Sequence, residues 1–513
     1  MLFSFWNPAL FSVFRYKIYR NGISTPLLYQ DFQRRGGEFP ENGVERTEDL
    51  PYAAKHGWVG EIKRLCKAGG ITDTDREYAV YNAVGDNRPD ALVALVDGCP
   101  GIDIPARRSP NSDGIGPLWD AVVNGFHLVT KILLQAGADP NLTDARGRTP
   151  VGMASNYGFA DTVAMLLQNG ADPNRVQTGD GTTPVIVASG FGHTETVDVL
   201  LQNGADPNQA STNDGAAPIV MASLGGHTAT VEVLLKNCAD PNQAMTTDGA
   251  TPIIMASQFG NTSTIEVLLQ NDADPNRAKT SNGATAIWMA SQDGHTATVS
   301  VLLQNGADPN RAKTDDGATP IFIASVHGHT ATVEVLLQNG ADPNQATTDG
   351  ANYTPLKIAA RSGHAATVEV LLQNGADPNQ ASTNDGVTPI WIASQNGLTA
   401  TVAALLQNGA DPNLAKTDDG ATPIFMASVH GHTATVEVLL QNGADPNQAT
   451  TDGDMTPIFQ ASLAGHTATV EVLLQNGTDP NLADEDGDTP LDMAKQEGHT
   501  EVVALLRAAG ANE

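Results

Sequence analysis

The 513-residue chain has few aromatic, cysteine and basic residues. Phe, Trp and Tyr make up 5% of it. A single compact core is implausible for a chain of 513 residues. There are 28 Lys and Arg against 58 Asp and Glu, a formal net charge of −30, so the chain lacks the basic stripe that binds nucleic-acid phosphates. Its cysteines, Cys66, Cys99 and Cys238, are odd in number and show no framework spacing, which predicts a reducing, cytoplasmic setting.

Signatures of catalytic and metal sites are also missing. The sequence contains no phosphate-binding loop, no Gly-x-Ser-x-Gly elbow and no His-Glu-x-x-His motif. Residues 484–488 resemble a calcium loop, but Lys495 stands where the bidentate Glu belongs. The His-x-His pairs at 327–329 and 430–432 have no Cys or further His in the same unit. We therefore predict that the protein is not an enzyme and binds neither a cofactor nor a metal.

The N-terminal segment differs from the rest of the chain. Its apolar residues 1–14 are too few to span a bilayer, and the basic residues follow them, the reverse of a secretory signal. Residues 1–35 hold five basic residues and one acidic residue. We predict a flexible leader and linker over residues 1–46, and a membrane-associated adaptor that uses residues 1–35 remains an alternative.

The rest of the chain is built from one short unit, seen clearly in residues 314–344. Asp315-Asp316-Gly317 has the chemistry of a tight turn, and Thr319 followed by Pro320 predicts the start of a helix. Apolar or small residues then recur at helical spacing, first before Gly328 and again before Gly340. Thr330 is expected to cap the second helix. Two helices this short enclose no core alone, so the unit needs neighbours on both sides.

The chain supplies these neighbours at a regular spacing. The prolines of the Asp-Pro pairs follow one another at 33 to 35 residues, at positions 140, 173, 207, 241, 275, 309, 343, 378, 412, 446 and 480. The Thr-Pro start, Ala-Ser pair, Gly-His reversal, Leu-Leu pair and Gly-Ala-Asp ending resemble the ankyrin repeat. The resemblance implies an all-α ankyrin-repeat solenoid of helix-turn-helix units joined by hairpin loops.

The domain organisation follows from the quality of the repeats. Two degenerate ankyrin-like repeats are predicted over residues 47–113 as an N-terminal cap. Eleven regular repeats are predicted over 114–486, and a more highly charged capping repeat over 487–513. Solenoids need such atypical end units because their outer faces meet water.

One position departs from the family. The His that usually follows Thr-Pro-Leu is replaced here mainly by apolar residues, and five of the replacements form a candidate aromatic strip: Trp288, Phe322, Trp391, Phe425 and Phe459. Lys357 interrupts the strip. Such a strip is either an exposed partner site or packing between neighbouring units, and the sequence leaves both open.

In the ankyrin family the first helices and turn tips form a concave face that binds a partner protein. Carried onto this sequence, the exposed positions are the pairs after Ala-Ser or its equivalent, and the candidates there are Tyr157, Phe191, Phe259, His327, Arg361 and His430. We therefore predict a monomeric, non-enzymatic scaffold or adaptor that binds one or more proteins. A regulatory or targeting subunit of an enzyme complex is the alternative.

Overall fold

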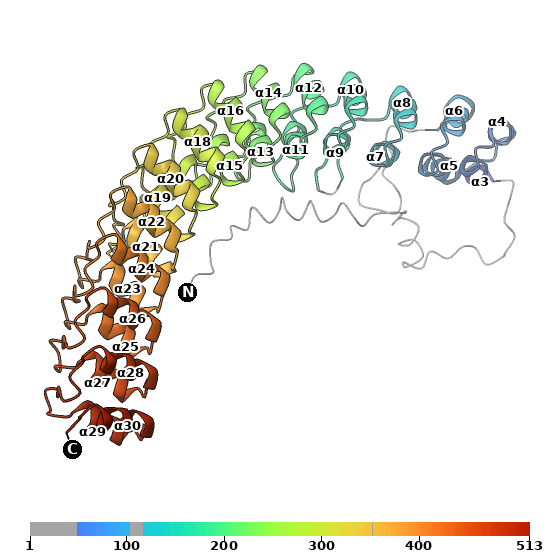
Figure 1. The fold of residues 1–513 in the computed structure, drawn as a ribbon. Coiled ribbons are helices and arrows are strands. Elements are labelled where there is room, and N and C mark those ends of the chain that lie inside the picture. The colour runs from blue at the N-terminus through green and yellow to red at the C-terminus, as the bar shows by residue number, and fades with distance from the viewer. Residues whose placement is uncertain (1–48, 103–115, 145, 351, 513) are drawn as a thin grey trace. The chain divides into compact units, whose positions relative to one another are not determined.

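The computed structural model describes residues 49–102, 116–144, 146–350 and 352–512. These fall into two compact units, Met1–Ile102 and Asp103–Glu513, each treated by itself below. The predicted leader and linker, 1–46, lie outside the described residues, as does the proposed membrane-contacting segment 1–35. Within the described ranges all regular structure is helical, which confirms the predicted α-solenoid (Figure 1). The boundaries at 46, 113 and 486 stay predictions.

The N-terminal unit contains two helix pairs. They are α3 (Leu50–Lys55), α4 (Val59–Ala68), α5 (Asp73–Gly85) and α6 (Pro89–Gly98). Helix α3 packs on α5 and α4 packs on α6, so the pairs stack as repeats do. Thr72 and Asp75 form a capping box that fixes the start of α5.

The C-terminal unit continues this pattern through twelve helix pairs. The first helices are α7 (Pro117–Val123), α9 (Pro150–Tyr157), α11 (Pro184–Phe191), α13 (Pro218–Leu224), α15 (Pro252–Gln258), α17 (Ala286–Gln292), α19 (Pro320–Val326), α21 (Pro355–Ser362), α23 (Pro389–Gln395), α25 (Pro423–Val429), α27 (Pro457–Leu463) and α29 (Pro490–Gln496). The second helices are α8 (His127–Gln135), α10 (Ala160–Gln168), α12 (Thr194–Gln202), α14 (Thr228–Lys236), α16 (Thr262–Gln270), α18 (Thr296–Gln304), α20 (Thr330–Gln338), α22 (Ala365–Gln373), α24 (Thr399–Gln407), α26 (Thr433–Gln441), α28 (Thr467–Gln475) and α30 (Thr500–Ala508).

Helix ends follow the predicted local chemistry at one terminus and differ at another. In α19 the Thr319 hydroxyl accepts a hydrogen bond from the backbone N–H of Phe322 at 3.3 Å, as expected for an N-cap. In α20, however, His329 is the N-cap residue and makes no side-chain cap, so the expectation that Thr330 caps this helix was wrong. The Thr330 hydroxyl instead bonds the hydroxyl of Thr367 in the next repeat, at 2.8 Å. Contact with a neighbouring unit has replaced a local cap.

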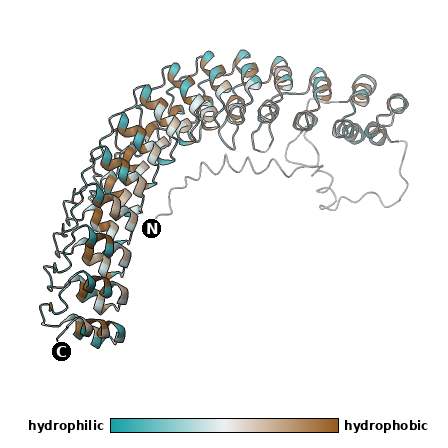
Figure 2. Cartoon of the chain, viewed as in Figure 1, coloured by the Kyte–Doolittle hydropathy of each residue, from teal (hydrophilic) through white to brown (hydrophobic). Residues whose placement is uncertain are grey.

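The core runs along the whole array, because each pair buries its apolar residues against the pairs before and after it. First helices pack on first helices, and second helices pack on second helices. In the repeat that begins at Thr319, Ile321, Ala324, Val333 and Leu336 are completely buried. Figure 2 shows the apolar residues gathered on the helices and the connecting turns largely hydrophilic.

Three kinds of polar contact recur between neighbouring repeats. The Asn that follows each Asp-Pro reaches the next repeat, as where Asn310 Nδ2 donates to Gly340 O at 2.9 Å and Asn310 Oδ1 accepts from the N–H of Asp342 at 2.7 Å. The reversal His bonds a carbonyl oxygen of the previous first helix, as where His432 Nε2 lies 3.1 Å from Gln395 O. Threonine hydroxyls pair across the second helices.

One junction lacks the last two contacts. Between the α21–α22 and α23–α24 pairs, Leu398 takes the place of the reversal His, and Ala365 takes the place of the bonding Thr. In the described repeats from α7 to α30, every other junction keeps at least one of the two or, at the first junction, a bond between His127 Nδ1 and the Thr162 hydroxyl in their place. Two asparagines bridge this junction instead, with Asn384 Nδ2 donating to Gly350 O at 2.6 Å and Asn396 Nδ2, at the C-cap of α23, donating to Arg361 O at 3.3 Å.

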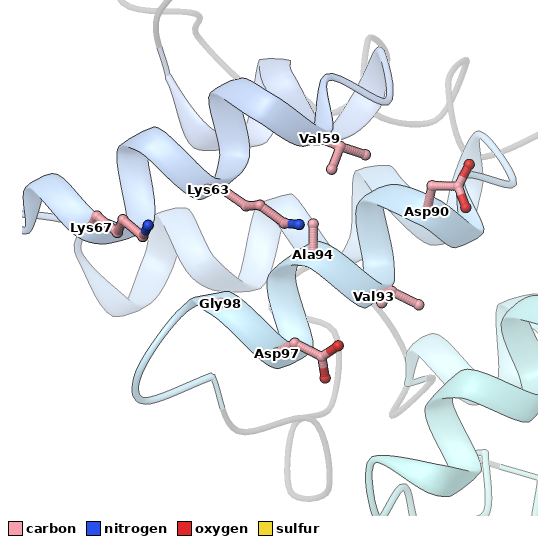
Figure 3. A pocket seen from close by; sticks show the side chains of 8 residues that line it. All are labelled: Val59, Lys63, Lys67, Asp90, Val93, Ala94, Asp97 and Gly98. Carbon is pink, nitrogen blue, oxygen red and sulfur yellow. The ribbon is translucent and has the colours of Figure 1, made fainter.

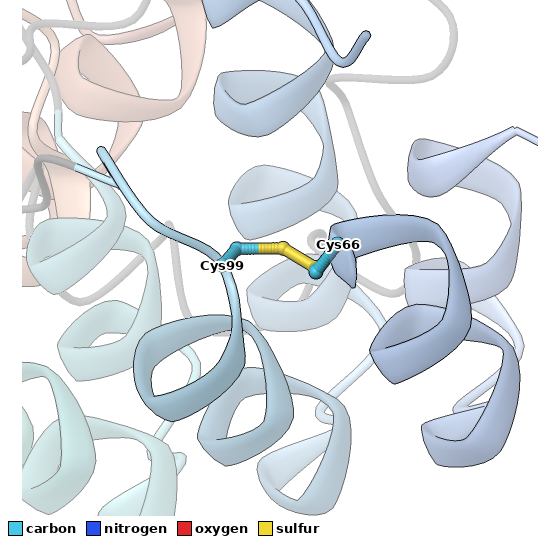
Figure 4. The surroundings of a disulfide bond; sticks show 2 residues. All are labelled: Cys66 and Cys99. Carbon is cyan, nitrogen blue, oxygen red and sulfur yellow. A yellow bond between two sulfur atoms is a disulfide. The ribbon is translucent and has the colours of Figure 1, made fainter. Parts of the chain in front are cut away.

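A disulfide joins Cys66, at the end of α4, to Cys99, the C-cap residue of α6 (Figure 4). The sequence did not predict this bond, because three cysteines are an odd number and show no framework spacing. The separation of 33 residues equals one repeat, so both occupy equivalent places in stacked units, with their Cα atoms 4.8 Å apart. Cys238 is free and exposed.

Candidate protein-binding face

Three large aromatic side chains are exposed at equivalent positions of the first helices. Tyr157 and Phe191 are the last residues of α9 and α11, and Phe259 is the C-cap residue of α15. Their exposed fractions are 44%, 39% and 40%. One residue separates each of them from a preceding Ala-Ser pair, so the repeat geometry places all three on the same face of the array. We call Tyr157, Phe191 and Phe259 the aromatic row.

Contacts within each repeat hold two of these rings in place. The Tyr157 ring stacks on Phe159, with centroids 5.5 Å apart and planes 24° apart. The Phe191 ring stacks on His193 at 5.9 Å and 27°. A ring already fixed in this way loses little conformational freedom on binding, which is the property of an interface anchor.

The same position holds histidine in two later repeats. His327 and His430 are exposed C-cap residues of α19 and α25. Each lies beside the reversal His of its own repeat, with centroids 5.8 Å apart in both cases. Partial desolvation of its ring lowers the pKa of His327, the nearby His329 lowers it further, and Asp293 opposes the shift. The described residues contain no group of three or more His, Cys, Asp or Glu side chains arranged to hold a metal ion.

The candidate aromatic strip lies mostly inside the array. Trp288, Trp391 and Phe425 are each 7% exposed and Phe459 is 3% exposed, while Phe322 is half-buried. The strip therefore offers a partner far less surface than the aromatic row does.

The two tryptophans of the strip join neighbouring repeats. The Trp288 indole N–H donates to Ala318 O at 3.1 Å, and the Trp391 indole N–H donates to Ala421 O at 2.9 Å. Both acceptors belong to the turn that precedes the next first helix. A lysine of the same turn also lies over each ring, Lys313 at 5.0 Å and Lys416 at 5.8 Å from the centroid. The indole thus ties one repeat to the next through a hydrogen bond and a cation–π contact at once.

Arg361, the remaining candidate, lies on α21, and its side chain is exposed. Nearby, the strip is interrupted by Lys357, which is only 1% exposed. Burial lowers the pKa of the Lys357 ammonium, and the negative charge of Asp385 acts in the opposite direction. Sequence reasoning noted this lysine only as an interruption, because burial of a cation cannot be read from repeat spacing.

The N-terminal unit has a hollow of its own between α4 and α6 (Figure 3). It is lined by Val59, Lys63, Lys67, Asp90, Val93, Ala94, Asp97 and Gly98. Charged side chains of both signs surround a few small apolar side chains, and this lining does not indicate a catalytic or ligand-binding site.

Family models confirm what the repeats and the helix pairs indicate. Residues 118–211, 209–279, 288–382 and 356–450 match a model described as ankyrin repeats (3 copies), and residues 458–507 match one described as ankyrin repeats (many copies). The matches cover more than half of the chain, so the chain belongs to the ankyrin repeat family. This family is a non-catalytic, protein-interaction fold.

Two human proteins are similar to part of the chain. Cyclin-dependent kinase 4 inhibitor B is 31% identical over 124 residues, which are 23% of this chain and 86% of that protein. Cyclin-dependent kinase inhibitor 2A is 36% identical over 125 residues, which are 23% of this chain and 76% of that protein. None of the helices in the described ranges combines the length and apolar character needed to cross a lipid bilayer.

Proposed function

We propose that the protein is a non-enzymatic scaffold or adaptor that binds partner proteins through the face formed by its first helices. The observation that carries this proposal is the exposed aromatic row, at equivalent positions of three repeats. Exposed aromatic side chains that line one face are typical of interaction sites, where they act as anchors. His327, Arg361 and His430 extend the proposed face along the later repeats.

In this proposal the aromatic strip is assigned to packing. Four of its five residues are buried, and its two tryptophans already use their indole N–H groups between repeats. A partner would have to open the stack to reach them, whereas the aromatic row is accessible without any rearrangement.

The test is a variant in which all three residues of the aromatic row, Tyr157, Phe191 and Phe259, are changed to Ser. A partner captured by the wild-type chain in stoichiometric amount is identified by mass spectrometry, and its dissociation constant is then measured. We expect the triple variant to bind at least about tenfold more weakly, because interface aromatics contribute a large share of binding energy.

Leu128→Ser is the control, since this residue of α8 is 56% exposed but lies on a second helix. It should leave the affinity unchanged. Equal binding by the triple variant and the wild type, with both folded as judged by circular dichroism, would remove the aromatic row from the binding face.

A regulatory subunit of an enzyme complex is the second candidate. Its support is the similarity of about a quarter of the chain to two proteins named as inhibitors of cyclin-dependent kinases. In that case the captured partner is a protein kinase, and the purified chain lowers its activity. A partner without catalytic activity favours the scaffold.

We further propose that the protein is monomeric and works in the cytoplasm. The Cys66–Cys99 disulfide argues against this location, because disulfides persist mainly in oxidising compartments. A cytoplasmic protein would hold both cysteines in the reduced form. Protein isolated from cells under alkylating conditions should then carry three blocked thiols, on Cys66, Cys99 and Cys238. A mass that shows only Cys238 alkylated would contradict a reducing location.

A further inference from the structure

The repeat that contains α21 brings two positive charges to the proposed binding face of an acidic array, one exposed and one buried beneath it. Lys357 and Arg361 are the basic residues on the first helices from α7 to α27, and both lie on α21. The whole chain carries a formal charge of −30. A positively charged site on a negatively charged surface can discriminate between partners by the position of their own charges.

Both cations lie against one tyrosine ring. Lys357 Nζ is 4.7 Å from the centroid of the Tyr353 ring, and the guanidinium carbon of Arg361 is 5.5 Å from it. Arg361 Nη1 also approaches the Tyr353 hydroxyl at 3.4 Å. Two like charges on one ring repel each other, and the ring compensates only part of that cost.

Other aromatic-bound cations of the array are neutralised by a carboxylate, and these two are not. Three cations that lie over tryptophan rings pair with an aspartate of a turn: Arg148 with Asp144 at 2.7 Å, Lys313 with Asp315 at 3.2 Å, and Lys416 with Asp418 at 2.8 Å. Among the described carboxylates, none lies within ion-pair distance of Lys357 or Arg361. Asp385 acts on Lys357 only through its longer-range field.

The two cations differ in what they can contact. Lys357 is buried and donates to the Ser382 hydroxyl, so it contributes charge from below the surface. Arg361 is exposed, and its guanidinium is always charged and can bind a planar oxyanion through two parallel hydrogen bonds. Of the two cations, Arg361 is therefore the one that a negatively charged group of a partner can reach.

We propose that Arg361, oriented by Tyr353 and backed by the charge of Lys357, binds one carboxylate side chain of the partner segment. This inference rests on the proposed function and specifies what that face recognises. The occupant is an isolated Asp or Glu within a neutral or basic stretch, because further negative charge is repelled by the acidic array. A phosphate monoester carries up to about two negative charges and is disfavoured for the same reason.

The experiment selects short random peptides, displayed on phage, against the full chain and against the Arg361→Gln variant. Peptides selected by the wild type should contain a common acidic residue, and that preference should disappear with Arg361→Gln. The control is Arg311→Gln, which removes the same charge from an exposed arginine outside the first helices. It should keep the preference. Matching circular dichroism spectra show that both variants are folded.

A double-mutant cycle then locates the contact. For a selected peptide, Arg361→Gln should weaken binding about tenfold or more, since a charge-assisted bidentate pair is lost. Changing the acidic residue of the peptide to its amide should cost as much, and combining both changes should cost little more. Phosphoserine in place of the acidic residue should bind no better.

Two results overturn the inference alone: selected peptides without an acidic preference, or equal losses for Arg361→Gln and Arg311→Gln. Tighter binding of the phosphoserine peptide overturns the choice of carboxylate. A wild-type chain that selects no peptide above background contradicts the proposed binding face as well, so the two failures can be told apart.

Discussion

Replacing Trp391 with alanine is expected to lower the free energy of unfolding of the C-terminal unit by about 3 to 5 kcal/mol, the range for truncation of a large buried aromatic side chain. Trp391 is 7% exposed, and its indole N–H donates to Ala421 O in the turn of the next repeat. The substitution leaves a cavity between two repeats and removes the partner of a carbonyl oxygen. Urea unfolding followed by circular dichroism measures the loss.

Tyr157→Ala is the matched control, because this aromatic residue of the same unit is 44% exposed. It should cost far less stability and should weaken partner binding instead. The reverse outcome, in which Trp391→Ala keeps the wild-type stability but loses the partner, would return the aromatic strip to the binding face.

The junction between the α21–α22 and α23–α24 pairs is expected to be the point at which the array separates on unfolding. A repeat array is stabilised by nearest-neighbour interfaces, so its weakest interface divides it into cooperative blocks. Ala365→Thr together with Leu398→His should supply the two missing contacts, to Thr401 Oγ1 and to Arg361 O, which in the wild type accepts from Asn396 Nδ2 at 3.3 Å. At about 0.5 to 1.5 kcal/mol per hydrogen bond, the pair should add about 1 to 3 kcal/mol at this interface.

Hydrogen exchange in mild denaturant reads the boundary directly. In the wild type, the amide protons on one side of residue 377 should lose their protection before those on the other side. In the double variant, the repeats before and after this residue should exchange together. The mirror control removes the same contacts one repeat later, by Thr399→Ala with His432→Leu, which breaks the bonds to Thr435 and Gln395. A boundary that stays in place in both variants would show that these contacts do not set it.

Repeat spacing was enough to predict the helices and their order. Thr319, Pro320 and Gly328 mark the ends of a helix by local chemistry, which needs no knowledge of neighbours. For Thr330 the local prediction was wrong. Its hydroxyl was predicted to cap its own helix, but it bonds Thr367 in the next repeat, because stacking brings that group closer. The Cys66–Cys99 disulfide likewise joins equivalent places of two stacked units, which the odd number of cysteines concealed.

The candidate site shows the same division. Sequence position placed Tyr157 and Arg361 on the first helices, and it also placed Trp288 there. Only the packed array decides that Tyr157 remains 44% exposed while Trp288 is 7% exposed, since the next turn covers the indole. Spacing fixes the position of a residue within its repeat, whereas burial depends on the side chains of its neighbours.

By itself, the sequence determined that this protein is an acidic array of ankyrin repeats, because the period and the helix-end chemistry are local and recur in every copy. The tertiary structure decided which aromatic residues face solvent, which junction lacks both the histidine and the threonine contact, and that Lys357 and Arg361 share one ring with no described carboxylate in ion-pair distance. The first two properties depend on pairs of residues in different repeats, which only stacking brings within contact distance. The third depends on the fold of one repeat, in which the Tyr353 ring lies against two side chains of α21.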